Sequence, residues 1–507
     1  MAKHVLIIGG GLGGLFCGAI LSKEGMEVTV LEKNATVGGG LQSFRRFGEV
    51  FDTGMHVVGG LQEGGNIRRL CQYLGIWDKV HVRRVPPECT DWLYFAEDRR
   101  CYQIASGREQ FVVSLSKYFP RQHDNLVRYV EAMYRVVDEM DLFHFRLSEH
   151  DIFSRSEEFG MAADKFIAKY ISDERLRQIL AYVNPLYGGR KDTTPAFIHA
   201  TISTLHINGL SRFAGGSQLF ADTLSDFIRA RGGHVFVGDG VHRIHAEGRS
   251  VTGVTTCSGR HFIADYYISD VHPCTLFSLF DDPSAFTRAY RMRLQEIPNT
   301  PSAFLLFLKL KPDTFRYLDY TGFYMQSYDS IWDVGQTGAP VARGFLYMTP
   351  PEINQGEFCR KMIIVDPMSW QEVERWADTS VGHRGADYEA WKQANAEELL
   401  LGMEEMFPGF RGCVEDINTA SPLTIRDYYG SKEGAMFGYA KDWKNLALSQ
   451  VPVLTKIPNL LLTGQCNNLH GFCGVPLTAV STCEAILGRN AVIKKIREKT
   501  CEPWGCS

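Results

Sequence analysis

The sequence predicts an α/β protein in which a discontinuous Rossmann-like domain, made of three segments, carries an inserted α+β domain. Two observations lead to this prediction. A β-α-β unit of roughly 30 residues opens the chain and contains a glycine-rich turn. Similar α/β character then returns twice, at 215–276 and at 459–488, with other structure between these stretches.

The predicted elements follow hydrophobic periodicity and stop signals along the chain. Short apolar runs ended by glycine predict strands, and apolar residues at helical spacing predict helices. In chain order these are a strand at His4–Ile8, a helix from Leu12 to about Gly25, a strand at Glu27–Glu32, helices at His123–Leu142, Met161–Ile171 and Gln218–Arg231, a strand at Ala303–Leu310, a helix at Tyr388–Phe407 and an α/β piece at Asn459–Gly488. We therefore predict a nucleotide-binding domain at 1–70, 211–285 and 441–507, and a substrate-binding domain at 71–210 and 286–440.

Composition and charge exclude several classes of protein. The chain has 507 residues, of which 45% are hydrophobic and 22% charged, as in ordinary globular proteins. With 54 Lys and Arg against 58 Asp and Glu, the net charge of −4 gives no reason to expect a nucleic-acid partner. The 13 cysteines form no CxxC pair, which argues against a disulfide framework or a zinc site. Since no apolar run approaches ~20 residues and a strand begins near the N-terminus, we expect a cytoplasmic protein without a signal peptide.

The first glycine motif, at residues 9–14, has the spacing GxGxxG and lies between a predicted strand and a predicted helix. Gly9 permits a tight turn, Gly11 lets the main chain approach a pyrophosphate, and Gly14 allows the helix to pack closely on the strand. The N-terminus of the helix offers free N–H groups to the anion. Glu32 suits a ribose hydroxyl and would repel a 2′-phosphate. The unit predicts a dinucleotide site, and a merely tight strand–helix turn is the alternative.

Two later glycine-rich stretches offer further contacts to such a ligand. Val37–Ser43 contains three consecutive glycines, which let main chain lie against a flat or charged ligand, and a flexible loop is the alternative. After a predicted strand come Gly464 and Gln465, and then a helix that starts near Val475. Gln465 can hydrogen-bond a polyol, and the helix can aim its positive end at an electron-rich heterocycle. The alternative is a helix that only packs against the domain.

Five side chains are candidates for proton transfer. His56 lies in the run 51–56, and His470 lies beside the third glycine stretch. Tyr187, Tyr428 and Tyr439 are further candidates, although core packing is the favoured interpretation of each tyrosine.

On these residues the chain resembles the FAD-dependent family of phytoene desaturases, carotenoid isomerases and retinol saturases. The first glycine motif with Glu32, and the glycines that follow, match the segments that bind FAD in that family. The run FDTGMH at 51–56, followed by Val57-Val58-Gly59, resembles the retinol saturase branch, as does Gly464-Gln465. The strand that begins at Val241 matches the family segment whose main chain meets adenine. The resemblance implies FAD as the cofactor and a fold like that of amine oxidases and phytoene desaturases.

The resemblance also implies cofactor contacts from all three segments of the nucleotide-binding domain. These residues are Gly9, Gly11, Leu12, Gly13, Gly14, Glu32, Lys33, Gly39, Gly40, Leu41, Gly54, Met55, His56, Val241, Gly464, Gln465, Gly474, Val475 and Pro476. His56 and His470 are the catalytic candidates, and no metal is expected.

The resemblance implies an oxidoreductase that acts on carbon–carbon double bonds of a lipophilic polyene, most like a retinol 13,14-reductase. Carotenoid desaturation and cis–trans isomerisation are alternatives within the family. A flavin amine oxidase shares the fold, and so does a prenyl-lipid-binding chaperone without flavin chemistry. The sequence has no second GxGxxG motif, which favours a quinone or a separate redox protein as electron donor or acceptor over transient docking of NAD(P)H. Because the expected substrate is lipophilic, we also expect peripheral contact with a membrane.

Overall fold

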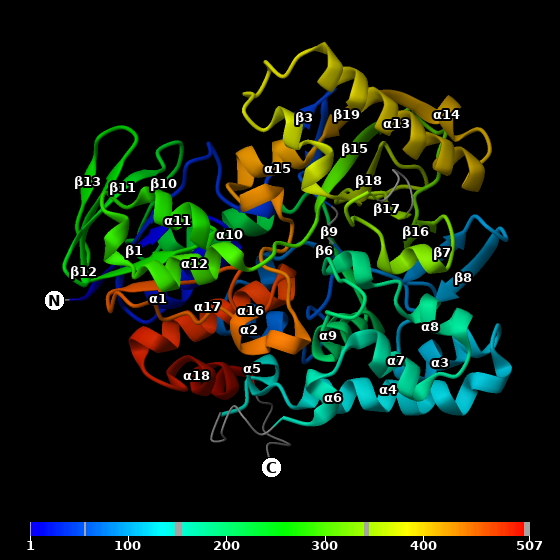
Figure 1. Ribbon diagram of the computed structural model, residues 1–507, viewed down its shortest axis with the longest axis horizontal. Coiled ribbons are helices and arrows are strands. Elements are labelled where there is room, and N and C mark those ends of the chain that lie inside the picture. The colour runs from blue at the N-terminus through cyan, green and yellow to red at the C-terminus, as the bar shows by residue number, and fades with distance from the viewer. Residues whose placement is uncertain (1, 55–56, 148–154, 339–343, 501–507) are drawn as a thin grey trace.

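A five-stranded parallel sheet and a seven-stranded mixed sheet dominate opposite sides of the molecule, with a layer of helices below the larger sheet (Figure 1). The computed structural model describes residues 2–54, 57–147, 155–338 and 344–500. The smaller sheet positions the predicted dinucleotide site.

The parallel sheet takes its strands from three distant parts of the chain. Its order is β10 (His234–Phe236), β2 (Glu27–Leu31), β1 (His4–Ile8), β14 (Tyr266–Ser269) and β20 (Leu460–Leu462). All four neighbouring pairs are parallel, so the carboxyl ends of the strands meet at one edge. The predicted discontinuous α/β architecture is thus confirmed, while the domain boundaries remain a prediction.

Helix α1 (Leu12–Lys23) follows β1 and is buried on more sides than its sequence pattern predicts. The pattern predicts one apolar face, but all residues from Gly13 to Ser22 are buried. The reason is that α17 (Gly471–Leu487) and α10 (Gln218–Arg229) pack on α1 in addition to the sheet. Gly18 permits the contact with α10, since a Cβ there would lie 2.7 Å from Ile228 Cδ1.

The turn between β1 and α1 depends on the absence of two side chains. Gly9 has a φ of +101°, which favours glycine, and its N–H donates to the Leu31 carbonyl at 2.9 Å. A Cβ on Gly14 would lie 2.2 Å from the Gly9 carbonyl oxygen. The helix therefore packs directly on the end of the strand, as the glycine spacing predicts.

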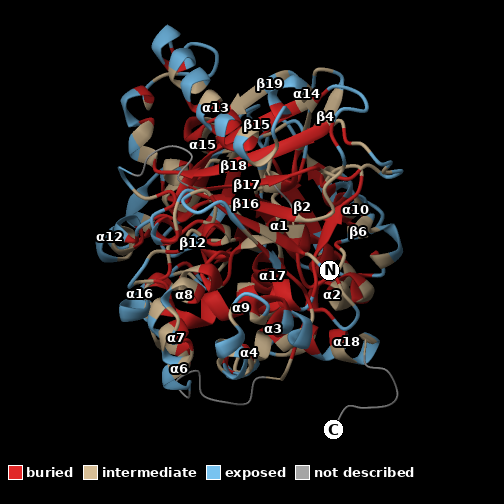
Figure 2. Cartoon of the chain, turned by 90° about the vertical axis from the view of Figure 1, so that its right-hand side faces the viewer, coloured by how far each residue is buried: buried red, intermediate tan, exposed pale blue. Residues whose placement is uncertain are grey.

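The larger sheet combines early and late parts of the chain. Its order is β19 (Val414–Ala420), β15 (Ser302–Leu310), β18 (Lys361–Met368), β17 (Gly344–Met348), β16 (Thr321–Met325), β7 (Asp91–Phe95) and β8 (Arg100–Ile104). Only the β16–β7 pair is parallel among these strands. One face packs against α13 (Ala386–Met406) through a cluster that includes Phe304, Tyr347 and Leu399. The central strands are buried in the interior, and the outer surface of α13 is exposed (Figure 2).

The helical layer lies below the larger sheet (Figure 1). Its members are α3 (Arg108–Ser116), α4 (His123–Asp138), α5 (Asp141–His144), α6 (Glu157–Gly160), α7 (Ala163–Tyr170), α8 (Glu174–Leu180) and α9 (Ala196–Ile207). Helix α4 ends earlier than the predicted Leu142, because Met140 has non-helical backbone angles and a separate short helix follows. A buried hydrogen bond of 2.6 Å joins the Tyr129 hydroxyl on α4 to Nε2 of His199 on α9.

Smaller elements complete the structure. One small sheet has the order β11 (Val241–Glu247), β12 (Ser250–Thr256) and β13 (His261–Phe262). A second pairs β3 (Ser43–Arg46) with β4 (Glu49–Asp52). A third has the order β5 (Val57–Val58), β9 (Ser211–Phe213) and β6 (Val82–Arg84). The remaining α-helices are α2 (Asn66–Leu74), α11 (Pro273–Leu279), α12 (Arg288–Glu296), α14 (Phe410–Cys413), α15 (Pro422–Tyr429), α16 (Leu446–Ser449) and α18 (Ala491–Thr500). Across the described residues, none of the helices combines the length and the apolar character needed to cross a membrane.

The first prediction concerns the contact between α1 and β1. Gly14→Ala places a methyl group against a main-chain oxygen, and such overpacking costs about 1–3 kcal/mol. We expect a lower midpoint of chemical unfolding and weaker retention of a bound dinucleotide. Gly412→Ala is the matched control, because a Cβ at Gly412 meets nothing within 4 Å. Equal unfolding midpoints for the two variants would contradict the packing argument.

Candidate functional site

The first and third glycine motifs meet at one carboxylate. Gly11, Gly13 and Gly464 all face Asp270, which directly follows β14. A Cβ on these glycines would lie 2.6, 2.5 and 2.5 Å from the Asp270 carboxylate oxygens. The three positions therefore form a cradle of bare main chain at the N-terminus of α1, beside the half-buried Leu12.

Glu32 lies at the carboxyl end of β2 and is held by main-chain donors. Its Oε2 accepts from the Gly10 N–H at 2.7 Å, and its Oε1 accepts from the Asn34 N–H at 2.8 Å. The side chain is buried. A carboxylate has about four lone-pair positions, so capacity remains for the hydroxyl groups of a ribose.

The segment after Glu32 contacts the start of β11. The Asp239 N–H donates to the Glu32 carbonyl at 3.1 Å, and a Cβ on Gly240 would lie 2.6 Å from Lys33 Cβ. Lys33 also donates from Nζ to the Asp427 carbonyl at 2.8 Å. Val241, the first residue of β11, is thereby next to the acid that is predicted to bind ribose.

The second glycine motif, at 38–40, packs against the turn formed by the first motif. The Gly38 N–H donates to the Gly10 carbonyl at 2.7 Å, and a Cβ on Gly39 would lie 3.1 Å from Gly11 Cα. The short turn at 39–41 contains Gly40 and the buried Leu41. The hydroxyl of Thr53, next to the half-buried Gly54, donates to the Gly40 carbonyl at 3.0 Å. Met55 and His56 lie outside the described residues.

The third glycine motif opens helix α17. The sequence predicts a helix start near Val475, but α17 begins at Gly471 with His470 as its N-cap residue. Pro476 lies inside the helix rather than at its first position. The early start depends on Gly474, because a Cβ there would lie 2.5 Å from Leu469 Cβ. The half-buried Gln465 and the buried Val475 flank this loop on either side.

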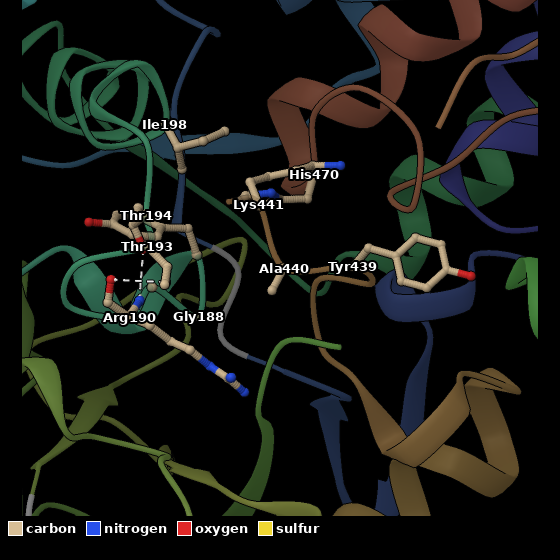
Figure 3. A pocket seen from close by; sticks show the side chains of 11 residues that line it. Gly188, Arg190, Thr193, Thr194, Ile198, Tyr439, Ala440, Lys441 and His470 are labelled. Atoms are coloured by element: carbon tan, nitrogen blue, oxygen red, sulfur yellow. Dashed lines mark hydrogen bonds between the residues drawn. The ribbon is translucent and has the colours of Figure 1, made fainter. Parts of the chain in front are cut away.

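His470 borders two cavities, and Ile198 is the other residue that lines both. The first is polar and includes Tyr187, Arg190, Thr193, Tyr439 and Lys441 in its lining. The second is mainly apolar and includes Phe143, Ile198, Ile202, Leu205 and Leu469 in its lining. Figure 3 shows His470 and Lys441 on one side of the polar cavity, with Arg190, Thr193 and Thr194 on the other.

The His470 ring is buried and has unused hydrogen-bonding capacity. Only 7% of the residue is exposed, and neither ring nitrogen has a hydrogen-bond partner among the described residues. Burial, reinforced by the nearby charge of Lys441, lowers the pKa of His470 to about 3. The imidazole is therefore neutral at physiological pH, with one nitrogen able to donate and the other able to accept.

Lys441 is the second ionisable group at this cavity, and sequence reasoning did not identify it. Its Nζ donates to the carbonyls of Asn467 at 2.6 Å and Ser449 at 3.0 Å. Burial lowers the pKa of Lys441 to about 8. A lysine with this pKa exchanges protons near neutral pH, which an ordinary lysine does poorly.

The structure separates the three tyrosine candidates. Tyr187 and Tyr439 line the polar cavity, whereas the side chain of Tyr428 is exposed on α15. The Tyr187 hydroxyl lies 3.3 Å from His199 Nδ1, and the Tyr439 hydroxyl lies 3.6 Å from Cys274 Sγ. Both hydroxyl groups have partners in the packed interior.

These features fit a dinucleotide that carries a redox ring. The bare glycine cradle and the N-terminus of α1 suit a pyrophosphate, and Glu32 suits the adjoining ribose. The N-terminus of α17, where His470 borders both cavities, suits the opposite end of such a ligand.

Comparison with known proteins identifies the family. The model of the flavin containing amine oxidoreductases matches residues 12–330. The chain belongs to this family. It is therefore an FAD-dependent oxidoreductase, and the predictions of fold class, enzyme class and cofactor are confirmed. The individual cofactor contacts and the catalytic histidines remain predictions.

Similar proteins extend over nearly the whole chain. The all-trans-retinol 13,14-reductase of Rattus norvegicus is 26% identical over 96% of this chain and 86% of its own length. Prolycopene isomerase 1 of an Oncidium hybrid cultivar is 21% identical over 85% of this chain and 74% of its own length. The solved structure of an oxidoreductase from Methanosarcina mazei has a TM-score of 0.63 at 17% identity, covering 95% of this chain and all of that one, and supports the fold.

The second prediction concerns Glu32. Glu32→Ala removes a charged acceptor, and a hydrogen bond to a charged group contributes roughly 1.5–3 kcal/mol, so FAD should dissociate roughly ten- to a hundredfold more readily. The measurement is the FAD content of the protein after extended dialysis. Glu27→Ala, at the exposed start of the same strand, is the control and should retain FAD. Undiminished FAD in the Glu32 variant would contradict the assignment.

Proposed function

We propose that this enzyme reduces a carbon–carbon double bond of a lipophilic polyene, in the manner of a retinol 13,14-reductase. The observation that carries the proposal is the His470 ring, buried and unpartnered between an apolar cavity and a polar one. The similarity to retinol 13,14-reductases over 96% of the chain supports the same reaction class.

The apolar cavity supports a hydrocarbon substrate. Aromatic and aliphatic side chains form most of its lining, and the polar exceptions are Thr201, Cys473 and His470. The Thr201 hydroxyl donates to the Phe197 carbonyl, and the Cys473 thiol donates to Asn66 Oδ1. Apart from the His470 ring, the polar groups of this wall are already paired, which favours an apolar chain because transfer of that chain from water is favourable. The polar cavity on the other side of His470 suits a hydroxyl or carboxyl end of the same molecule.

Saturation of a double bond requires a proton in addition to the reducing electrons. Bound FAD supplies the two-electron chemistry at a carbon–carbon bond. We assign His470 to relay this proton, because its neutral imidazole can take up a proton at one ring nitrogen while it releases one from the other, and because it borders both cavities. Lys441, which borders the same polar cavity, is suited to resupply that proton from Nζ.

Isomerisation is the second candidate function, since a prolycopene isomerase is among the similar proteins. An isomerase restores its proton and electrons within each turnover, so the same residues would serve it. Desaturation reverses the electron flow. These reactions differ in what happens to the flavin and to the mass of the product.

The proposed function is tested by anaerobic incubation of the reduced holoprotein with retinoids, carotenoids and unsaturated lipids. We expect oxidation of the flavin, followed by absorbance, and a product with two more hydrogen atoms. A product of unchanged mass with the flavin still reduced would indicate isomerisation. Oxidised holoprotein that yields a product lacking two hydrogen atoms would indicate desaturation, and oxidation of amines alone would indicate an amine oxidase.

The third prediction concerns His470. His470→Gln removes a group that transfers a proton, and loss of such a group typically lowers turnover about 10²–10⁴-fold. FAD content should be unchanged. His123→Gln is the control, because that ring is exposed on the helical layer. Normal turnover in the His470 variant would show that His470 takes no part in proton transfer.

Peripheral membrane contact is supported by apolar side chains near the polar cavity. The Trp443 N–H donates to the carbonyl of Thr193, which lines that cavity, and Trp443 is 37% exposed. Leu448 and Leu454, in the same part of the chain, are 52% and 59% exposed. We propose that this segment contacts the lipid surface from which the substrate is taken.

The fourth prediction tests this contact. The double substitution of Trp443→Ser and Leu448→Ser should lower the fraction of protein that floats with phosphatidylcholine liposomes, because less apolar area is then buried in the membrane. Ile263→Ser is the control, since Ile263 is 67% exposed but follows β13 in the nucleotide-binding part. Equal flotation of both variants and the parent protein would contradict the proposed surface.

A further inference from the structure

Asp270 lies over the N-terminus of α1 and is held there by the parallel sheet. Its main-chain N–H donates to the Ile8 carbonyl at 2.8 Å, which extends the pairing of β14 with β1. Its side chain points across the glycine cradle, where the nearest hypothetical Cβ positions of Gly13 and Gly464 lie 2.5 Å from Oδ1. The position of the carboxylate is therefore a consequence of strand order and not of a mobile loop.

The carboxylate uses the same groups that the helix offers to an anion. The main-chain amides of Gly11 and Gly14 act on the Asp270 carboxylate and favour its charged form. Gly11 is the N-cap residue of α1 and Gly14 lies in its first turn, where the helix dipole attracts negative charge. A negatively charged phosphate at this turn would meet the carboxylate as a like charge and as a competitor for the same donors.

We propose that the Asp270 carboxylate occupies the place in which the N-terminus of α1 receives the phosphates of FAD, so that FAD binding is coupled to the uptake of one proton by Asp270. The inference concerns the cofactor and is independent of the substrate. Asp270 acts here as a residue that determines cofactor affinity, and it has no assigned part in the reaction.

The charges around Asp270 favour its neutral form. Glu32 at the end of β2 acts on it as a like charge, whereas Cys466, in the loop after β20, is a neutral thiol because burial raises its pKa to about 12. Among the described residues, no lysine or arginine is among the groups that shift the pKa of Asp270. Burial, together with Glu32, raises the pKa of Asp270 to about 7 and outweighs the opposing effect of the two amide donors.

The direction of the pH dependence follows from linkage. In the protein without cofactor, Asp270 loses its proton as the pH rises through about 7. Phosphates next to it raise its pKa further, so the complex holds the proton at higher pH than the free protein does. FAD affinity is then greatest at pH values below about 7 and falls at higher pH, by at most about tenfold per pH unit.

The experiment measures FAD release on dilution of the full-length holoprotein between about pH 6 and about pH 8.5, followed by the rise in flavin fluorescence. For the parent protein we expect the dissociation constant to increase by up to about thirtyfold across this range. Asp270→Asn keeps the shape and removes the charge, and should bind FAD more tightly than the parent protein at high pH, with little pH dependence. Asp226→Asn on the exposed face of α10 is the matched control and should behave like the parent protein.

Two ligands identify the phosphates as the cause without relying on any variant. The phosphates of ADP occupy the same position as those of FAD, so both ligands lose affinity together as the pH rises. The concentration of ADP that displaces FAD should therefore change little with pH. Displacement by adenosine, which carries no phosphate, should become easier as the pH rises. A parent protein whose FAD affinity does not change with pH overturns the proposal, and so does equal pH dependence for ADP and adenosine displacement. If Asp270→Asn does not fold, this ligand comparison decides the question by itself.

Discussion

The direct packing of α1 on the end of β1 is the contact on which the rest of the dinucleotide site depends. Without a side chain at Gly14, the first turn of the helix reaches the Gly9 carbonyl, and the free N–H groups of that turn are aimed at the strand ends. The parallel sheet brings β14 and β20 to the same edge, so Asp270 and Gly464 face this turn. A larger residue at position 14 would move the helix away and would disturb all of these contacts at once.

The site is electrostatically unusual because two carboxylates border one helix N-terminus. Glu32 has its two oxygens fixed by the amides of Gly10 and Asn34. Asp270 shares the amides of α1 with any incoming anion and lies in the field of Glu32. A helix N-terminus attracts negative charge, but a carboxylate that already accepts from its N–H groups leaves fewer donors for a phosphate. The chain thereby combines an attractive site for phosphate with a built-in competitor.

The cavities beside His470 present a different problem, because buried polar groups border them. A buried imidazole with two free nitrogens, and a buried ammonium bound only to carbonyls among the described residues, both cost stability in a packed interior. Buried polar groups that lower stability in this way cluster at sites where a ligand or a reaction uses them. The apolar lining on the other side of His470 separates this polar region from a space suited to hydrocarbon. The arrangement allows one molecule to present an apolar chain and a polar end to the same histidine.

The sequence by itself determined the elements whose signals are local. The glycine spacing at 9–14, the acid at Glu32 and the apolar strand before them predict the nucleotide-binding unit, because turn geometry and strand–helix packing depend on neighbouring residues. Tertiary structure decided what no local signal carries. Asp270 reaches the glycine cradle only through the pairing of β14 with β1, and Lys441 becomes a buried base only because the loop before α17 folds over it. The start of α17 at Gly471 was likewise decided by packing, since Gly474 must fit against Leu469. A lone Asp or Lys in the sequence resembles any surface charge, and its pKa is set by burial and by neighbours that are distant along the chain.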